Sequence, residues 1–76
     1  MAATSTSQLS AEMVANVLSV HVAPGDAVAA GDIVVLLESM KMEIPVLAER
    51  AGTVVEVMVE PGDVVQEGDV LVVLSH

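Results

Sequence analysis

A single pattern is written twice in this 76-residue chain, and this duplication constrains the fold more than any other feature. Residues 17–37 align without a gap on residues 54–74, at the offset of 37 that separates Pro24 from Pro61. Two copies are too few for a solenoid, which needs about three repeats to bury a continuous face. The duplication therefore predicts two halves that pack on each other about a pseudo-twofold axis.

Each copy has the pattern of several short β-strands. In residues 19–22 and 56–59, valine occupies every second position, which is the period of a half-buried strand. Pro-Gly-Asp follows in both copies and favours a chain reversal, because Pro fixes φ, Gly tolerates positive φ and Asp supplies an acceptor. A second Gly-Asp turn then precedes an unbroken apolar run, which we expect to be a buried strand.

The composition agrees with an all-β fold. Hydrophobic residues make up 54% of the chain and none is aromatic, so the core must be built from aliphatic side chains, among which the β-branched Val and Ile outnumber Leu. We predict a flattened β-barrel or sandwich of two four-stranded antiparallel sheets with internal pseudo-twofold symmetry, an arrangement that limits open edges. Residues 1–10 lack periodicity, and we predict that they form a flexible tail before a single domain at residues 11–76.

The charge of the chain argues against several classes of partner. Its formal net charge is -9, with Lys41 and Arg50 as the only Lys or Arg residues, so phosphate backbones and anionic lipid surfaces would repel it. Its apolar runs are far shorter than the roughly 20 residues that span a bilayer. The sequence shows no signal peptide and no cysteine. We expect no nucleic-acid or membrane partner, and a cytoplasmic location.

The segment between the two copies contains the feature that the repeat does not explain. If Leu37 and Ile44 lie on paired strands, the chain reverses at Met40-Lys41, which lacks the Gly, Asn or Asp that tight hairpins prefer. A turn built against propensity indicates selection for another purpose. Lys41 is also the only lysine, and hence the only side-chain amine available for acylation. Composition alone also fits a solvated lysine between methionines that fill the core.

The residues around this lysine match a known signature. Met40-Lys41-Met42, preceded by Glu38 and the small residue Ser39, resembles the biotin-attachment motif of biotin-dependent carboxylases. Three residues alone recur by chance, but these lie at the midpoint of a duplicated all-β pattern. The sequence is therefore identified as a member of the biotinyl/lipoyl attachment domain family.

The resemblance covers roughly residues 11–75, including the paired Gly-Asp turns and Gly52 at the start of the second half. It departs from the family at Ser39, where Ala or Val is commoner, and at Val14-Ala15, where Pro-Gly is often seen. What it implies is a flattened β-barrel with the modified lysine on an exposed hairpin and the chain ends at the opposite end. It further implies a small stand-alone carrier without the protruding thumb of some bacterial carriers.

The resemblance also implies a function. A biotin protein ligase would join biotin to Lys41 through an amide, with Met40 and Met42 as the flanking motif. Residues assigned to ligase recognition are Glu38, Ser39 and Glu43. The attached biotin would carry CO2, as carboxybiotin, between a biotin carboxylase and a carboxyltransferase. The carrier itself would perform no catalysis, and would raise the effective concentration of the cofactor at both active sites.

Two other functions stay open at this point. A lipoyl carrier shares the fold and the hairpin lysine, although lipoyl sites usually have an acidic residue where this chain has Met40. An unmodified or accessory β interaction module would not need the unusual turn at Lys41. We expect no metal site, because His21 and His76 have no companion His or Cys at ligand spacing and turn formation explains the Gly-Asp pairs. The acceptor that is carboxylated depends on the partner enzyme.

Overall fold

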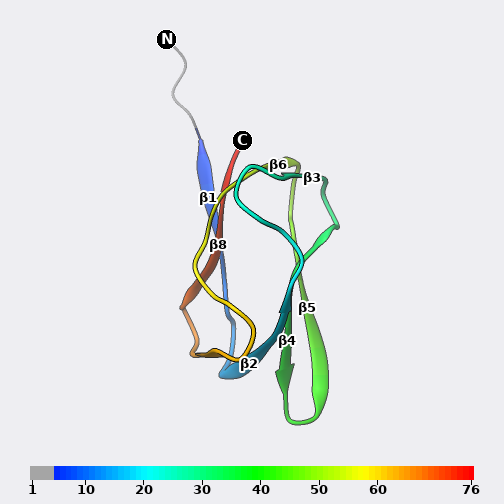
Figure 1. Ribbon diagram of the computed structural model, residues 1–76, viewed down its shortest axis with the longest axis vertical. Helices are drawn as coiled ribbons and strands as arrows, with labels where there is room; N and C mark the ends of the chain where they lie inside the picture. Colours follow the sequence, from blue (N-terminus) through cyan, green and yellow to red (C-terminus); the bar gives the residue numbers. More distant parts are fainter. Residues whose placement is uncertain (1–4) are drawn as a thin grey trace.

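The computed structural model describes residues 5–76 and contains two antiparallel sheets, whose strands run mainly along the length of an elongated molecule (Figure 1). The strands are β1 (Thr6–Ser10), β2 (Ala15–Val20), β3 (Ala27–Val28), β4 (Ile33–Ser39), β5 (Met42–Leu47), β6 (Gly52–Val57), β7 (Val64–Val65) and β8 (Val70–Ser75). One sheet has the order β1-β8-β6-β3 and the other has the order β5-β4-β2-β7. The prediction of an all-β fold with two four-stranded sheets is confirmed.

The two sheets repeat each other at the offset found in the sequence. Strands β2, β3 and β4 have β6, β7 and β8 as their counterparts. Val17 pairs with Leu37 in one sheet, and Val54 pairs with Leu74 in the other. Both of these ladders carry a register shift directly after the pair, so even the irregularities are duplicated. The predicted pseudo-twofold symmetry is therefore confirmed down to the strand register.

The prediction of a flexible tail over residues 1–10 was wrong for Thr6–Ser10. These residues form β1, an edge strand that pairs with β8 as β5 pairs with β4. Leu9 is only 7% exposed, so its side chain belongs to the core and its burial helps to order the strand. Residues 1–4 of the predicted tail lie outside the described residues.

A signal for β1 was present in the sequence. Ala11 and Glu12 recur as Ala48 and Glu49 at the same offset of 37 residues. Both alanines are buried, and the N–H of each donates to the carbonyl of an aspartate in a Gly-Asp turn at 2.9 Å. The repeat therefore extends through the N-terminal strand, whose polar residues lack the valine pattern of the other strands.

The core between the sheets is entirely aliphatic. Its most deeply buried side chains are Leu37, Leu71, Leu74, Val34, Val35, Val54 and Val72. No polar or charged side chain is buried among residues 5–76, and no helix there is long and apolar enough to span a membrane. Burial of branched apolar surface therefore holds the two sheets together.

Four Gly-Asp turns close the connections between strands. In the first turn, Gly25 has a φ of 94°, and the N–H of Asp26 donates to the carbonyl of Ala23 at 3.0 Å. The Asp26 carboxylate accepts the Ala23 N–H at 2.8 Å, and the other three turns repeat this bond. These bonds confirm the interpretation of the Gly-Asp pairs as turns. Within residues 5–76, no group of three or more His, Cys, Asp or Glu residues could hold a metal ion.

Replacing Leu9 by Ala tests whether β1 is part of the fold. We expect the free energy of unfolding to fall by about 2–3 kcal/mol, because the substitution leaves a cavity beneath an edge strand. Urea unfolding followed by circular dichroism measures this change. The matched control is Gln8→Ala, at an exposed position on the same strand, which should change the stability by less than about 0.5 kcal/mol. Equal stability of the two variants would restore the flexible-tail interpretation.

Candidate functional site at the hairpin between β4 and β5

Lys41 lies at the tip of a tight hairpin. Strands β4 and β5 pair as far as Ser39 and Met42, which leaves Met40 and Lys41 as a two-residue loop. Figure 1 shows this hairpin at the bottom of the molecule, with the C-terminus near the top. The predicted reversal at Met40-Lys41 is confirmed, and so is the placement of the chain end away from it.

Both residues of the loop have a backbone conformation that L-amino acids disfavour. The φ angle is 53° at Met40 and 65° at Lys41, as in the type I′ turns that usually contain Asn or Gly. Each such residue costs about 1 kcal/mol relative to the right-handed region. The flanking strands supply the compensation, because Leu37, opposite Ile44, is 2% exposed and fixes the register. The turn therefore forms from residues that turn propensity disfavours.

The two methionines beside Lys41 are displayed to solvent. Met40 is 91% exposed and Met42 is 65% exposed, so the interpretation of these residues as core fillers is wrong. Lys41 is exposed between them. The tip therefore presents an amine flanked by two adaptable apolar side chains, which suit contact with an apolar enzyme pocket.

A pair of glutamates faces outward one step behind the tip. Glu38 lies directly opposite Glu43, and like charges in this arrangement destabilise a sheet by roughly 0.2–1 kcal/mol. The counterparts of these residues in the other sheet are Ser75 and Thr6, which also lie opposite each other. The same strand pairing is built there without charges, so the fold does not require the glutamate pair.

Exposed apolar residues also gather at this end of the molecule. Met13 and Val14, which are 42% and 63% exposed, immediately precede Ala15, where β2 begins. Val64, which is 66% exposed, lies opposite Asn16 in the adjacent strand. Their counterparts at the other end are Arg50, Ala51 and Ala27. Exposed apolar side chains therefore lie around the hairpin at positions where the fold does not require them, although others, such as Ile33 and Leu47, are exposed elsewhere.

Strand β2 accommodates Val14-Ala15, where the family often has Pro-Gly. Ala15 is 4% exposed and pairs with Val65 at the start of β2. Its counterpart Gly52 has no space for a side chain, since a Cβ there would lie 2.6 Å from the Ser75 carbonyl oxygen. The first half therefore tolerates a methyl group where the second half requires glycine.

The two histidines take part in hydrogen bonds. His21 Nε2 lies 2.8 Å from Ser19 Oγ. His76 Nδ1 donates to the Ala51 carbonyl at 2.9 Å, and its Nε2 lies 2.6 Å from Ser7 Oγ. His76 thereby connects β1 to the start of β6, at the end of the molecule away from Lys41.

Replacing Met40 by Asn tests the strain in the turn. Asn tolerates positive φ better than Met, so we expect the free energy of unfolding to rise by about 0.5–1 kcal/mol. Thermal and urea unfolding measure the change. Met42→Asn is the matched control, since position 42 is equally apolar but has no positive φ, and it should bring no such gain. A stability unchanged by Met40→Asn would show that the loop is unstrained.

The biotin/lipoyl family, described as "Biotin-requiring enzyme", matches residues 4–74. Biotinylated protein TB7.3 of Mycobacterium tuberculosis is 71% identical over 38 residues, which cover 50% of this chain and 54% of that protein. The chain thus spans about half the length of the curated relatives that it matches first.

Two solved structures have the same fold. A single-chain, multi-domain long-chain acyl-CoA carboxylase superposes with a TM-score of 0.87 and 37% identity, covering 93% of this chain and 7% of that chain. The lipoyl domain of the 2-oxoglutarate dehydrogenase complex from Azotobacter vinelandii superposes with a TM-score of 0.73 and 33% identity, covering 83% and 80%. The family match over nearly the whole chain and these superpositions lead to one conclusion: the chain belongs to the biotin/lipoyl attachment domain family.

Proposed function

We propose that the chain is a biotin carboxyl carrier, with biotin joined through an amide to Lys41. The observation that carries this proposal is the position of Lys41, which is exposed at a strained two-residue hairpin tip between two solvent-exposed methionines. The biotin would carry CO2, as carboxybiotin, from a biotin carboxylase to a carboxyltransferase. Both enzymes and the ligase that attaches biotin are partners in this proposal.

The attachment step is an acyl transfer to the lysine amine. The Lys41 Nζ forms an amide bond with the carboxyl carbon of an activated biotin, the activating group leaves with the bonding electron pair, and a base in the ligase takes the proton. The side chain loses its positive charge, which makes this end of the molecule more acidic. Exposure of the tip gives a ligase access to Nζ without unfolding of either strand.

The chain's own contribution after attachment is presentation of the cofactor. When bound, biotin supplies a ureido nitrogen that accepts and releases CO2. The rigid pairing of β4 with both β2 and β5 fixes the hairpin, while the lysine arm extends from its tip. Tethering replaces free diffusion with an effective concentration in the millimolar range. No residue of this chain is assigned a catalytic role in the proposal.

The residues beside Lys41 favour biotin over lipoate. Met40 stands where lipoyl sites usually have an acidic residue. The carboxylase superposes more closely than the lipoyl domain does, and the first relatives are described as biotinylated. A lipoyl carrier is therefore the second candidate, supported by the shared fold and by a family that includes lipoyl domains.

Recognition by the ligase is proposed to use both faces of the hairpin. Met40 and Met42 would enter an apolar pocket, and the small side chain of Ser39 leaves space beside the turn. The outward-facing Glu38 and Glu43 would guide the tip toward a basic ligase surface, increasing the rate of encounter more than the affinity. This role accounts for a like-charge pair that the equivalent sheet lacks.

Intact mass spectrometry of the protein purified from its native cells tests the modification. We expect a mass increase of one biotinyl group, located on Lys41 by fragmentation. Lys41→Arg should lose that mass and the streptavidin mobility shift while keeping its circular dichroism spectrum, since position 41 is exposed. A lipoyl adduct, or an unmodified Lys41, would overturn the proposal.

A second test exchanges the glutamate pair for its counterparts. The double variant Glu38→Ser and Glu43→Thr should retain or gain stability, because a repulsive pair is removed. We expect the kcat/KM of a biotin protein ligase to fall about tenfold with this substrate, and the loss to shrink at high salt. The matched control places glutamates at Ser75 and Thr6, and should destabilise the fold without slowing biotinylation. Equal ligation of the wild-type protein and the double variant would remove the glutamates from recognition.

A further inference from the structure

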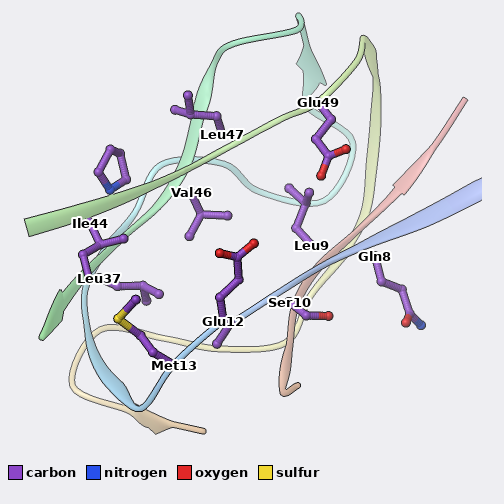
Figure 2. Close-up of a pocket in the computed structure, with 12 residues that line it drawn as sticks. Gln8, Leu9, Ser10, Glu12, Met13, Leu37, Ile44, Val46, Leu47 and Glu49 are labelled. Carbon is purple, nitrogen blue, oxygen red and sulfur yellow. The ribbon is translucent and has the colours of Figure 1, made fainter. Parts of the chain in front are cut away.

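A groove of about 340 Å³ lies between β1 and β5, which are the edge strands of the two sheets (Figure 2). Leu37 and Ile44 line it at one end, only two pairs behind the hairpin tip. Met13 and Val46 add further apolar surface. The groove therefore begins close to the hairpin that carries Lys41.

The internal symmetry separates what the fold requires in this groove from what it does not. Glu12 and its counterpart Glu49 both line the groove, so the pseudo-twofold axis passes through it. Met13 and Ile44 have Arg50 and Ser7 as their counterparts, and these two line a neighbouring cavity of about 360 Å³. At these two positions the half nearer to Lys41 has apolar side chains where the other half has polar ones, whereas Ser10 and its counterpart Leu47 show the reverse.

The half of the groove nearer to Lys41 also contains a hydrogen-bond acceptor. Figure 2 shows the Glu12 side chain extending into the groove between Val46 and Leu9, with its carboxylate toward the middle. A carboxylate accepts N–H bonds strongly. The head group of biotin is a ureido ring with two N–H donors, fused to an apolar sulfur-containing ring. The N–H groups can donate to a carboxylate while the sulfur-containing ring packs against apolar side chains. The dithiolane ring of lipoate has no N–H donor.

The groove lies within reach of a group attached to the tip. Ile44 is three residues from Lys41 along an extended strand, which corresponds to about 10 Å. The arm of a biotinyl-lysine has about eleven bonds, and extends about 12 Å at the advance per bond of an extended chain. A tethered group needs only weak contacts to dock, because its effective concentration is in the millimolar range.

We propose that the Glu12 half of this groove binds the ureido head group of biotin carried on Lys41 of the same chain, an inference that rests on the proposed function. Met13 and Ile44 contact the sulfur-containing ring, and the Glu12 carboxylate accepts a ureido N–H. The carrier thus holds its own cofactor against the β5 edge between visits to its partner enzymes.

Nuclear magnetic resonance of 15N-labelled protein tests this docking, with unmodified, biotinylated and pentanoylated samples compared. The pentanoyl sample carries the arm without the ring. We expect biotin, but not pentanoyl, to shift the amide signals of Met13, Ile44 and Val46, and to give nuclear Overhauser contacts between its ring protons and the Ile44 methyl groups. Shifts confined to residues 40–42 would show that the head group does not dock and would overturn the proposal.

Two matched variants locate the acceptor. Glu12→Ala should reduce the biotin-dependent shifts at Ile44 and Val46 by about half or more, because a charge-assisted hydrogen bond is lost. Glu49→Ala removes the symmetry-related carboxylate from the half farther from Lys41 and should leave them unchanged. Equal effects of the two variants would exclude Glu12 as the specific acceptor. The spectra of the unmodified variants verify that each one folds.

Two routes of biotin attachment allow the docking proposal and the proposed function to be tested independently. Biotin is attached by a biotin protein ligase, and in parallel by an active ester of biotin that acylates Lys41, the only side-chain amine. Lys41→Arg treated with the same ester is the blank for reaction at the N-terminal amine. Failure of the ligase alone would count against the carrier function, whereas absent shifts in the chemically biotinylated protein would count against the groove.

Discussion

Burial of two aliphatic strands between the sheets is the interaction on which the rest of this structure depends. In β4, Val34, Val35 and Leu37 are almost completely buried, and their counterparts in β8 are buried to the same extent. Each of these strands is paired on both sides within its sheet. A displaced β4 would carry the hairpin with it, so the core sets the position of Lys41 although it touches none of the residues at the tip. It also offsets the strain of the two residues with positive φ.

The duplication acts as an internal control that few small domains provide. The Gly-Asp turns and the buried valines are the same in both halves, and the fold explains these shared residues. Differences at equivalent positions instead mark residues that the backbone does not require. Three features are of this kind. They are the glutamate pair, whose counterparts are Ser75 and Thr6, the exposed apolar residues near the tip, and the Met13 and Ile44 side chains in the groove. They concentrate at one end of the molecule, around the hairpin.

Much of the fold could be predicted from the sequence, because the repeat, the valine alternation and the turn residues are local signals. The reversal at Met40-Lys41 followed from the two flanking strands even though its residues disfavour a turn. Strand β1 was missed because Thr6–Ser10 are mostly polar, and only the recurrence of Ala-Glu indicated their place. Hydropathy could not tell whether Met40 and Met42 are buried, because even apolar residues are exposed where a hairpin extends beyond the core.

Other parts of the site depend on register and on contacts between distant segments. The opposition of Glu38 and Glu43 becomes visible only when the β4–β5 register is known. The groove brings β1 beside β5, although about 35 residues separate them, so no local pattern could indicate it. The sequence motif alone suggested residues 38–43 as the site. The structure added the exposure of Met40 and Met42 and the cross-strand pairing of the glutamates.

The contact between Ser5 and His76 has a consequence for how such a domain can be built into larger proteins. The N–H of His76 donates to the Ser5 carbonyl at 2.8 Å, at the place where the symmetry of the fold would otherwise put a second hairpin. The chain therefore enters at Ser5 and leaves at His76 from the pole opposite to Lys41, and a fused polypeptide would extend the domain at that pole. Such a fusion attaches the added polypeptide at one pole and leaves the Lys41 hairpin at the other pole accessible. The domain can therefore be joined to a larger assembly without any change to the hairpin.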